Sequence, residues 1–186
     1  YERCWDRHSL EIGAYGLTAH DQPGNGKPLS GPTDKYRDAA VDAQYQFIGE
    51  DHLFTALATY IDEHQTLNAS VADGLAANVD NDLKTIKLTG EYYYRRKIGG
   101  SVGYFSTTGS SDPLLYAAAA VTGSANFSPD TAGYVAEVNY LPWLNVKLQL
   151  QYTAYSKFNG GRTNYDGTAR AASDNDTTYL LIWLNY

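Results

Sequence analysis

The sequence lacks long apolar runs, has a single cysteine and contains no methionine. A membrane-spanning helix needs roughly 20 consecutive apolar residues, and the longest apolar candidate, residues 114–121, is far shorter than that. Because there is only one cysteine, Cys4, an internal disulfide is excluded. The absence of an initiator Met and of a signal peptide predicts a mature, processed or partial chain, with one domain over residues 1–186.

Basic residues are also scarce: 14 Lys and Arg stand against 21 Asp and Glu, for a net charge of −7. Because nucleic-acid-binding proteins carry a basic stripe or patch, this balance argues against a nucleic-acid partner. The sequence offers no Ser/His/Asp set, glycine-rich phosphate loop or pair of catalytic carboxylates, so we expect no enzymatic activity. What the chain has in abundance is Tyr and Gly, 17 of each, a composition typical of strands and turns.

Apolar and polar residues alternate along much of the chain, which is the pattern of a β-strand with one apolar and one polar face. In "NVKLQLQYTAY", residues 145–155, Val146 and Leu148 fall on one face, whereas Lys147 and Gln149 fall on the other. Eight segments show this period of two. The predicted strands are residues 8–19, 36–48, 53–64, 83–95, 100–108, 132–141, 145–157 and 177–186.

The connections between these strands alternate strictly between short turns and long loops that are rich in turn-forming residues. The short turns are residues 49–52, 96–99 and 142–145, and the long loops are residues 20–35, 65–82, 109–131 and 158–176. Barrels of the bacterial outer membrane have short periplasmic turns and long extracellular loops. The sequence therefore predicts an all-β, antiparallel up-and-down transmembrane β-barrel, surrounded by lipid, in the outer membrane of a Gram-negative bacterium.

Aromatic residues of the apolar face gather at the strand ends beside the short turns. Amphipathic rings favour the headgroup region of a bilayer, so we predict that they form one aromatic girdle of the barrel. Its predicted members are Tyr45, Phe47, Phe54, Tyr92, Tyr94, Tyr140 and Tyr186. Tyr104 and Tyr134 predict a weaker girdle near the long loops. The final run, "YLLIWLNY", resembles the C-terminal insertion signal of such barrels, and closing a barrel would require this strand to pair with the first.

The polar faces of the predicted strands carry charged and amide side chains that would face the lumen of a barrel. They are Glu11, Asp42, Gln44, Lys87, Glu91, Glu137, Lys147 and Gln149. Two interpretations stay open. Acids outnumber bases, so these side chains would bias a water-filled lumen toward cations. Alternatively, the charges pair with one another inside a small, filled barrel, because an unpaired buried charge is costly.

Histidines and loop acids are the candidates for metal ligands. The spacing of His8, His20, His52 and His64 does not match a metal site, so we predict surface roles for them. The acids of "DNDL", residues 80–83, and "SDNDT", residues 173–177, lack the twelve-residue pattern of a calcium loop. No catalytic, cofactor-binding or metal-ligating residue is therefore assigned.

Several stretches of the sequence are together similar to one protein family. They are "RHSLEIGAYG", "DAQYQFIG", "GYFSTTGS" and the whole run from Leu141 to the end. They resemble the C-terminal barrel region of the proteobacterial outer-membrane fused cytochrome c–porin family. In that family an N-terminal segment with a haem-binding CxxCH precedes a porin-like barrel, and relatives move electrons across the outer membrane. The resemblance implies the barrel part of such a protein, with a periplasmic electron carrier as a partner.

The chain departs from that family because it contains no CxxCH, so no haem-attachment residue can be assigned to it. Haem c is expected only if such a segment lies upstream in the full-length protein. "YERCW", residues 1–5, reads as the tail of an earlier strand followed by a turn at Asp6–Arg7, which suggests the C-terminal part of a longer barrel.

Two further architectures stay open. One is a complete, small eight-stranded barrel, whose interior is filled by side chains. It would have a structural, adhesive or surface-recognition role through its long loops. The other is a soluble lipocalin-like ligand binder, which would point its apolar face inward.

Overall fold

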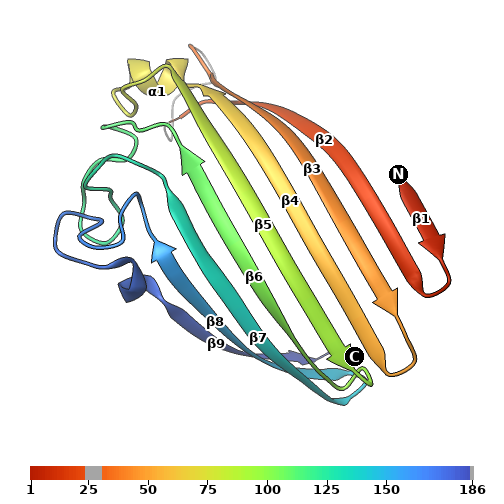
Figure 1. Ribbon diagram of the computed structural model, residues 1–186. Helices are drawn as coiled ribbons and strands as arrows, with labels where there is room; N and C mark the ends of the chain where they lie inside the picture. Colours follow the sequence, from red (N-terminus) through yellow and green to blue (C-terminus); the bar gives the residue numbers. More distant parts are fainter. Residues whose placement is uncertain (24–30, 185–186) are drawn as a thin grey trace.

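The computed structural model describes residues 1–23 and 31–184, which form a single antiparallel sheet of nine strands. The strands lie in chain order, so each one pairs with its neighbours in the sequence (Figure 1). They are β1 (Glu2–Trp5), β2 (His8–Asp21), β3 (Asp34–Ile48), β4 (His52–Thr66), β5 (Asp80–Tyr94), β6 (Ile98–Gly109), β7 (Thr131–Trp143), β8 (Val146–Lys157) and β9 (Thr177–Leu184). A short helix, α1 (Asn68–Ala72), and a 3-10 turn, η1 (Ala172–Asn175), lie in the long loops. No helix of the described part is long and apolar enough to span a membrane.

The all-β fold and its eight predicted strands are confirmed, and their ends lie close to those that alternation predicts. The ninth strand is β1. It covers "ERCW", where the sequence suggested the tail of an earlier strand, and a turn at Asp6–Arg7 leads from it into β2. The count of eight was therefore one too low, because β1 is too short for its period of two to stand out.

The sheet is open over the described residues. β1 and β9 are its two outer strands, and the expected pairing between the first and the last strand is not present there. The reason lies in β1, which pairs with the start of β2 from Glu2 opposite Glu11 to Trp5 opposite His8. That part of the outer edge of β2 is therefore already occupied. The coarser prediction of an antiparallel up-and-down sheet is correct, whereas a closed barrel is not seen.

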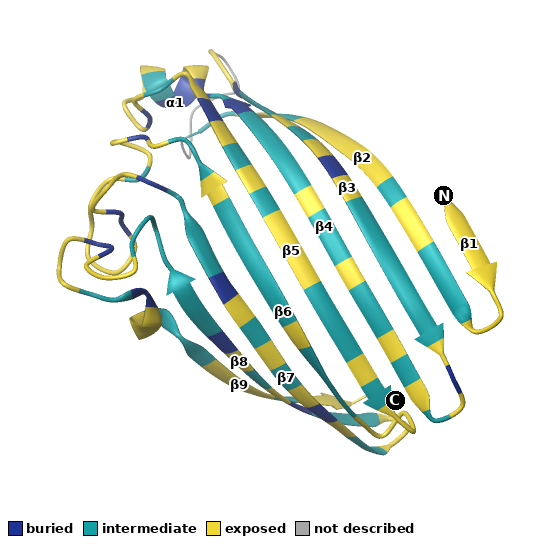
Figure 2. Cartoon of the chain, viewed as in Figure 1, coloured by how far each residue is buried: buried dark blue, intermediate teal, exposed yellow. Residues whose placement is uncertain are grey.

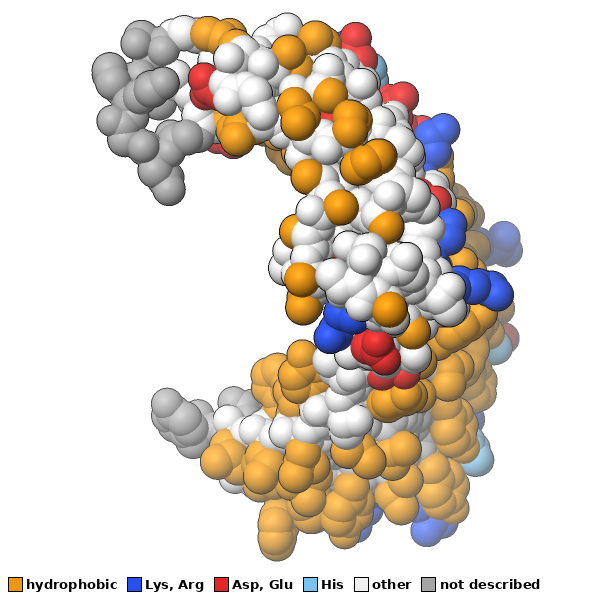
Figure 3. Space-filling model, turned by 90° about the vertical axis from the view of Figure 1, so that its left-hand side faces the viewer, with side chains coloured by type: hydrophobic (Ala, Val, Ile, Leu, Met, Phe, Trp, Pro, Cys, Tyr) orange, Lys and Arg blue, Asp and Glu red, His pale blue; other side chains and the backbone are white. Residues whose placement is uncertain are grey.

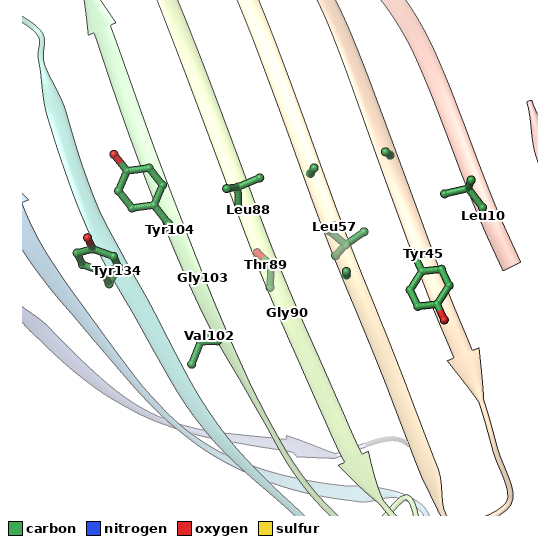
Figure 4. A pocket seen from close by; sticks show the side chains of 13 residues that line it. Leu10, Tyr45, Leu57, Leu88, Thr89, Gly90, Val102, Gly103, Tyr104 and Tyr134 are labelled. Atoms are coloured by element: carbon green, nitrogen blue, oxygen red, sulfur yellow. The ribbon is translucent and has the colours of Figure 1, made fainter. Parts of the chain in front are cut away.

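The sheet curls into a trough, which has a C-shaped outline when it is viewed from its loop-bearing side (Figure 3). Residues that lie opposite each other in an antiparallel pair share a face. Tyr45 lies opposite Leu10, and Leu88 lies opposite Tyr104, which in turn lies opposite Tyr134. Figure 4 shows these side chains on the convex side of the sheet. The apolar face predicted from alternation is therefore the outer face of the trough.

The exposure of individual side chains agrees with this orientation. Leu150, Ile182 and Leu184 on the convex face are 51%, 63% and 70% exposed. Gln149, on the concave face, is only 7% exposed. The apolar residues that are fully buried gather mainly at the loop end, around α1 and the neighbouring loops (Figure 2). The strands themselves thus have no sealed apolar centre within residues 1–23 and 31–184.

Gly99 on β6 lies beneath an aromatic ring of the neighbouring strand, and we expect it to tolerate no side chain. A Cβ at Gly99 would lie 2.3 Å from Cδ1 of Tyr93. We predict that Gly99→Val lowers the free energy of unfolding by about 1–3 kcal/mol, because the ring must move. Urea denaturation measures the change. Gly90→Ala is the matched control, since a Cβ there meets nothing within 4 Å. Equal losses in both variants would contradict the packing of Tyr93 over Gly99.

Candidate functional site

The concave face of the trough carries all eight polar residues that were predicted to face a lumen. Glu11 lies opposite Gln44, and Glu137 lies opposite Gln151 on the same face. The remaining members follow from the same register of opposed residues: Asp42, Lys87, Glu91, Lys147 and Gln149. These residues are spread along seven strands, β2 to β8, and so they form a lining rather than a single cluster.

The concave face is strongly acidic. The strands place two lysines on it, Lys87 and Lys147. The acids of the same face are Glu2, Glu11, Asp21, Asp34, Asp38, Asp42, Glu63, Glu91 and Glu137. This excess gives the inner surface of the trough a negative potential.

These concave charges do not form a paired network in the part of the chain that the structure describes. The ion pairs found there lie at the short turns, at the loop end or on the convex face, as in Arg7–Glu50 (3.1 Å), Arg95–Asp51 (3.2 Å) and Lys157–Asp130 (3.0 Å). None of the ion pairs includes a charged member of the predicted lumen set. A lining of unpaired charges needs contact with water, because a dry interior would make each of them costly.

The convex face carries the predicted aromatic girdle beside the short turns. Its described members are exposed or half-buried side chains of one face: Tyr45, Phe47, Phe54, Tyr92, Tyr94 and Tyr140. Tyr186 lies outside the described residues. The second predicted belt is represented by Tyr104 and Tyr134, whose rings contact each other at 5.3 Å.

Sequence reasoning missed that two histidines belong to this girdle. His8 Nδ1 lies 2.7 Å from the hydroxyl of Tyr45, and His52 Nδ1 lies 2.7 Å from that of Tyr92. The His8 ring also stacks on Trp5, with ring centres 5.4 Å apart. The signal was available, because both histidines begin a strand directly after a short turn. They hold the tyrosine hydroxyls at the level where an amphipathic belt is wet.

The structure offers no place for a metal or for covalently attached haem in the described residues. His20 contacts Thr33 (3.3 Å) and His64 contacts Asp82 (2.8 Å), both at the loop end of the sheet. No group of three or more His, Cys, Asp or Glu side chains is placed to hold a metal ion there. Cys4 is exposed and has no second cysteine beside it. Covalent attachment of haem c needs two cysteines before a histidine, so this chain does not fit that group.

A shallow apolar groove crosses the convex face near its middle (Figure 4). Ala43, Ala56 and Gly90 are among the small residues that floor it, and Tyr45 and Tyr104 stand on either side. Its volume is about 610 Å³. The groove shows that small residues, rather than charges, make the low parts of this outer surface.

The long loops pack against one another through buried aspartates, which sequence reasoning had treated only as turn-formers. Asp112, which is 0% exposed, accepts hydrogen bonds from the backbone N–H groups of Ala77 (3.0 Å) and Asn78 (2.8 Å) in the β4–β5 loop. It also accepts the N–H groups of Leu114 and Leu115 in its own loop, both at 3.0 Å. One carboxylate therefore joins two loops.

Two further aspartates act in the same way. Asp34 at the start of β3 is 1% exposed and accepts the backbone N–H groups of Ala69 (2.8 Å) and Ser70 (3.1 Å) in α1. Asp166 in the β8–β9 loop accepts the N–H of Val121 (2.9 Å) in the β6–β7 loop. An Asp beside turn-forming residues commonly accepts nearby backbone N–H groups. That local signal does not reveal the second loop to which each carboxylate binds.

No family model matches the chain, and neither a curated protein nor a solved structure matches it. The geometry itself defines a class: an all-β protein with one curved antiparallel sheet, apolar on its convex face and acidic on its concave face.

The pH dependence of the loops follows from the hydrogen bonds of Asp112. Burial alone raises the pKa of its carboxyl, but the backbone N–H donors of Leu115, Asn78, Ala77 and Leu114 lower it from 3.8 to about 2. A carboxyl with a lowered pKa stabilises the folded loops above its unfolded value and loses that contribution as the pH falls through about 2. We therefore expect the β6–β7 loop to resist an acid-active protease at pH 4 and to be cleaved near pH 2.

Asp112→Asn provides the control for this pH dependence. A neutral amide has one acceptor oxygen for the N–H donors and does not titrate, so the variant should be cleaved at both pH values. An unstructured peptide corrects for the activity of the protease itself. Opening of the native loop already near pH 4 would contradict the role assigned to Asp112.

Proposed function

We propose that this chain is part of the wall of a porin-like β-barrel in a bacterial outer membrane. The observation that carries the proposal is the exposure of apolar side chains on the convex face, together with charged side chains on the concave face. Val102, Val138 and Leu180, all convex, are 69%, 62% and 75% exposed. In water such a continuous apolar surface would be a liability, whereas hydrocarbon is the solvent that suits it.

The dimensions of the apolar surface support this environment. On the convex face of β3, the apolar stretch runs from Ala39 to Phe47, and Lys35 and Arg37 follow it toward the loop end. A transmembrane strand needs about 9–11 residues when tilted by roughly 45°. The girdle at Tyr45 and Phe47 would then lie at the periplasmic headgroups, because short turns are periplasmic in such barrels.

The two edges of the sheet support a barrel larger than these nine strands. An unpaired edge cannot exist in hydrocarbon, because its N–H and C=O groups would have no partners. β9, "TTYLLIWL", has no charge or proline that would protect an edge in water, and Leu180 and Trp183, on its opposite faces, are 75% and 57% exposed. Closing an eight-stranded barrel would need β9 to pair along all of β2, where β1 already lies. This argues against the complete, small barrel as the alternative.

A larger barrel has room for a water-filled lumen. The unpaired acids and lysines of the concave face need that water. A lipocalin-like binder would bury its apolar face inside, which is opposite to the curvature of this sheet. The chain therefore functions, in our proposal, as one side of a hydrophilic conduit.

Spin-label accessibility tests the orientation of the two faces. In a Cys4→Ser background of the full-length protein in lipid vesicles, nitroxides attached at Val102→Cys and Leu180→Cys should contact oxygen more than a water-soluble nickel complex. Labels at Thr89→Cys and Ser101→Cys, on the concave face, should show the reverse. The physical reason is that oxygen partitions into hydrocarbon whereas the nickel complex stays in water. The same ratio on both faces would rule out the membrane orientation.

The resemblance to fused cytochrome–porins supports an electron-transfer role for the full-length protein, with a periplasmic electron carrier as its partner. Haem c would then be attached outside residues 1–186. Absorbance in the Soret region of the purified full-length protein tests this part of the proposal. We expect a Soret band that resists extraction by acidic acetone, as covalent haem does. Its absence would remove the electron-transfer role and leave the porin-like wall unaffected.

A further inference from the structure

The β6–β7 loop folds inward and covers one row of the concave face at the loop end. In that row Gln65 lies opposite both Tyr36 and Asn81. Asn81 Nδ2 donates a hydrogen bond to Asp112 in the loop (3.3 Å). Asn81 and Gln65 are 1% and 6% exposed, although they belong to the open side of the trough. The segment that begins at Asp112 therefore lies over the inner surface of β4 and β5.

Tyr116 extends this inward segment further across the sheet. Its backbone N–H donates to the carbonyl oxygen of Asp112 (3.0 Å), which sets it one turn beyond the anchor. Burial, followed by the charges of Asp112 and Glu63, raises the pKa of the Tyr116 phenol, and Tyr36 is the next neighbour. The side chain thus lies near β3 and β4, although its own loop joins β6 to β7. This inward position brings a loop residue to the lining of the trough.

The strands beneath Tyr116 present acceptor oxygens that have no donors. Asp38 on β3 lies directly opposite Glu63 on β4, on the concave face. Oδ1 of Asp38 is buried and has no hydrogen-bond partner. Gln65 donates its amide nitrogen to Glu63, but the amide oxygen of this buried side chain is also without a partner. Buried acceptors normally have a donor or a cation beside them.

The basic side chains that are near in sequence all lie elsewhere. Lys84 is on the convex face, where it pairs with Asp62 (3.8 Å). Lys35 and Arg37 alternate with Tyr36 and so also lie on the convex face. The two concave lysines are nearer the short turns: Lys87 lies opposite Thr59, and Lys147 is at the start of β8. The loop end of the lining is therefore negative without local compensation.

We propose that Tyr36, Asp38, Glu63 and Tyr116 line a constriction at the loop end of the lumen, which selects small hydrated cations over anions. This inference rests on the proposed porin-like wall. The inward loop brings the Tyr116 phenol over the opposed carboxylates, and low-dielectric walls focus their field into the remaining space. Rings of carboxylates select cations in other channels by the same physical effect.

Ion selectivity of the full-length protein in planar bilayers tests the constriction. With a KCl gradient across the membrane, the reversal potential should show that K⁺ permeates more readily than Cl⁻. We expect the double variant Asp38→Asn/Glu63→Gln to lower this permeability ratio by about threefold or more, because it removes the local negative potential at nearly constant shape. The loss should be larger at low salt, where screening is weaker.

Glu50→Gln is the matched control. It also removes one carboxylate, but in a short turn, where Glu50 pairs with Arg7 at 3.1 Å. It should leave the permeability ratio unchanged. Tyr116→Ala should increase the single-channel conductance, since it removes a ring from the narrow part. Both variants need the native heat-dependent gel mobility to show that the barrel has formed.

The outcomes separate the two proposals. A current whose selectivity is unchanged in the double variant would overturn the constriction and leave the porin-like wall standing. Complete absence of current from folded protein would overturn the open lumen, and the constriction with it. A lowered ratio in the double variant, with the Glu50→Gln ratio unchanged, would support the assignment of Asp38 and Glu63.

Discussion

The whole structure depends on the backbone hydrogen-bond ladder, which each strand completes only with its neighbours in the sheet. In helices the ladder closes within one segment, but a strand needs a partner on both sides. This requirement leaves the side chains free to divide between two faces with a period of two. Apolar side chains such as Val102 and Leu150 can then be exposed on one face, because no interior core is needed to hold the strands together. The same requirement makes the free edges of β1 and β9 the features that most restrict the possible surroundings.

The division of faces was open to prediction, and the closure of the sheet was not. A period of two fixes which residues share a face, so the strands and the single face of Glu11, Lys87 and Glu137 follow from the sequence. Curvature and edge pairing depend on twist and on which strand occupies which edge, and neither leaves a mark in alternation. β1 illustrates the difficulty, since four residues decide whether the outer edge of β2 is free.

The loops were the least predictable part, because their structure comes from contacts distant in sequence. Turn-forming residues predict where a loop lies but not which loop it meets. Asp112 binds N–H groups of residues 77 and 78, and Asp34 binds those of residues 69 and 70, across separations of about the length of a hairpin. A buried carboxylate that accepts several backbone N–H groups is stable only when all of them converge, so the loops must order together. No pattern along the chain encodes that convergence.

Ordered loops also explain how a polar lining can have a defined narrow point. A long loop left to its conformational entropy would sample the lumen and its surroundings alike, and ordering each residue costs about 1–2 kcal/mol. The carboxylate of Asp112 offsets part of this cost by fixing the segment on the inner surface, with Tyr116 one turn further on. The loop end then differs from the turn end in kind: it has unpaired acids under a fixed segment, whereas the turn end has the belt of aromatic rings and histidines outside. Because the two ends are built from different side chains, the conduit that we propose has a direction imposed by its sequence.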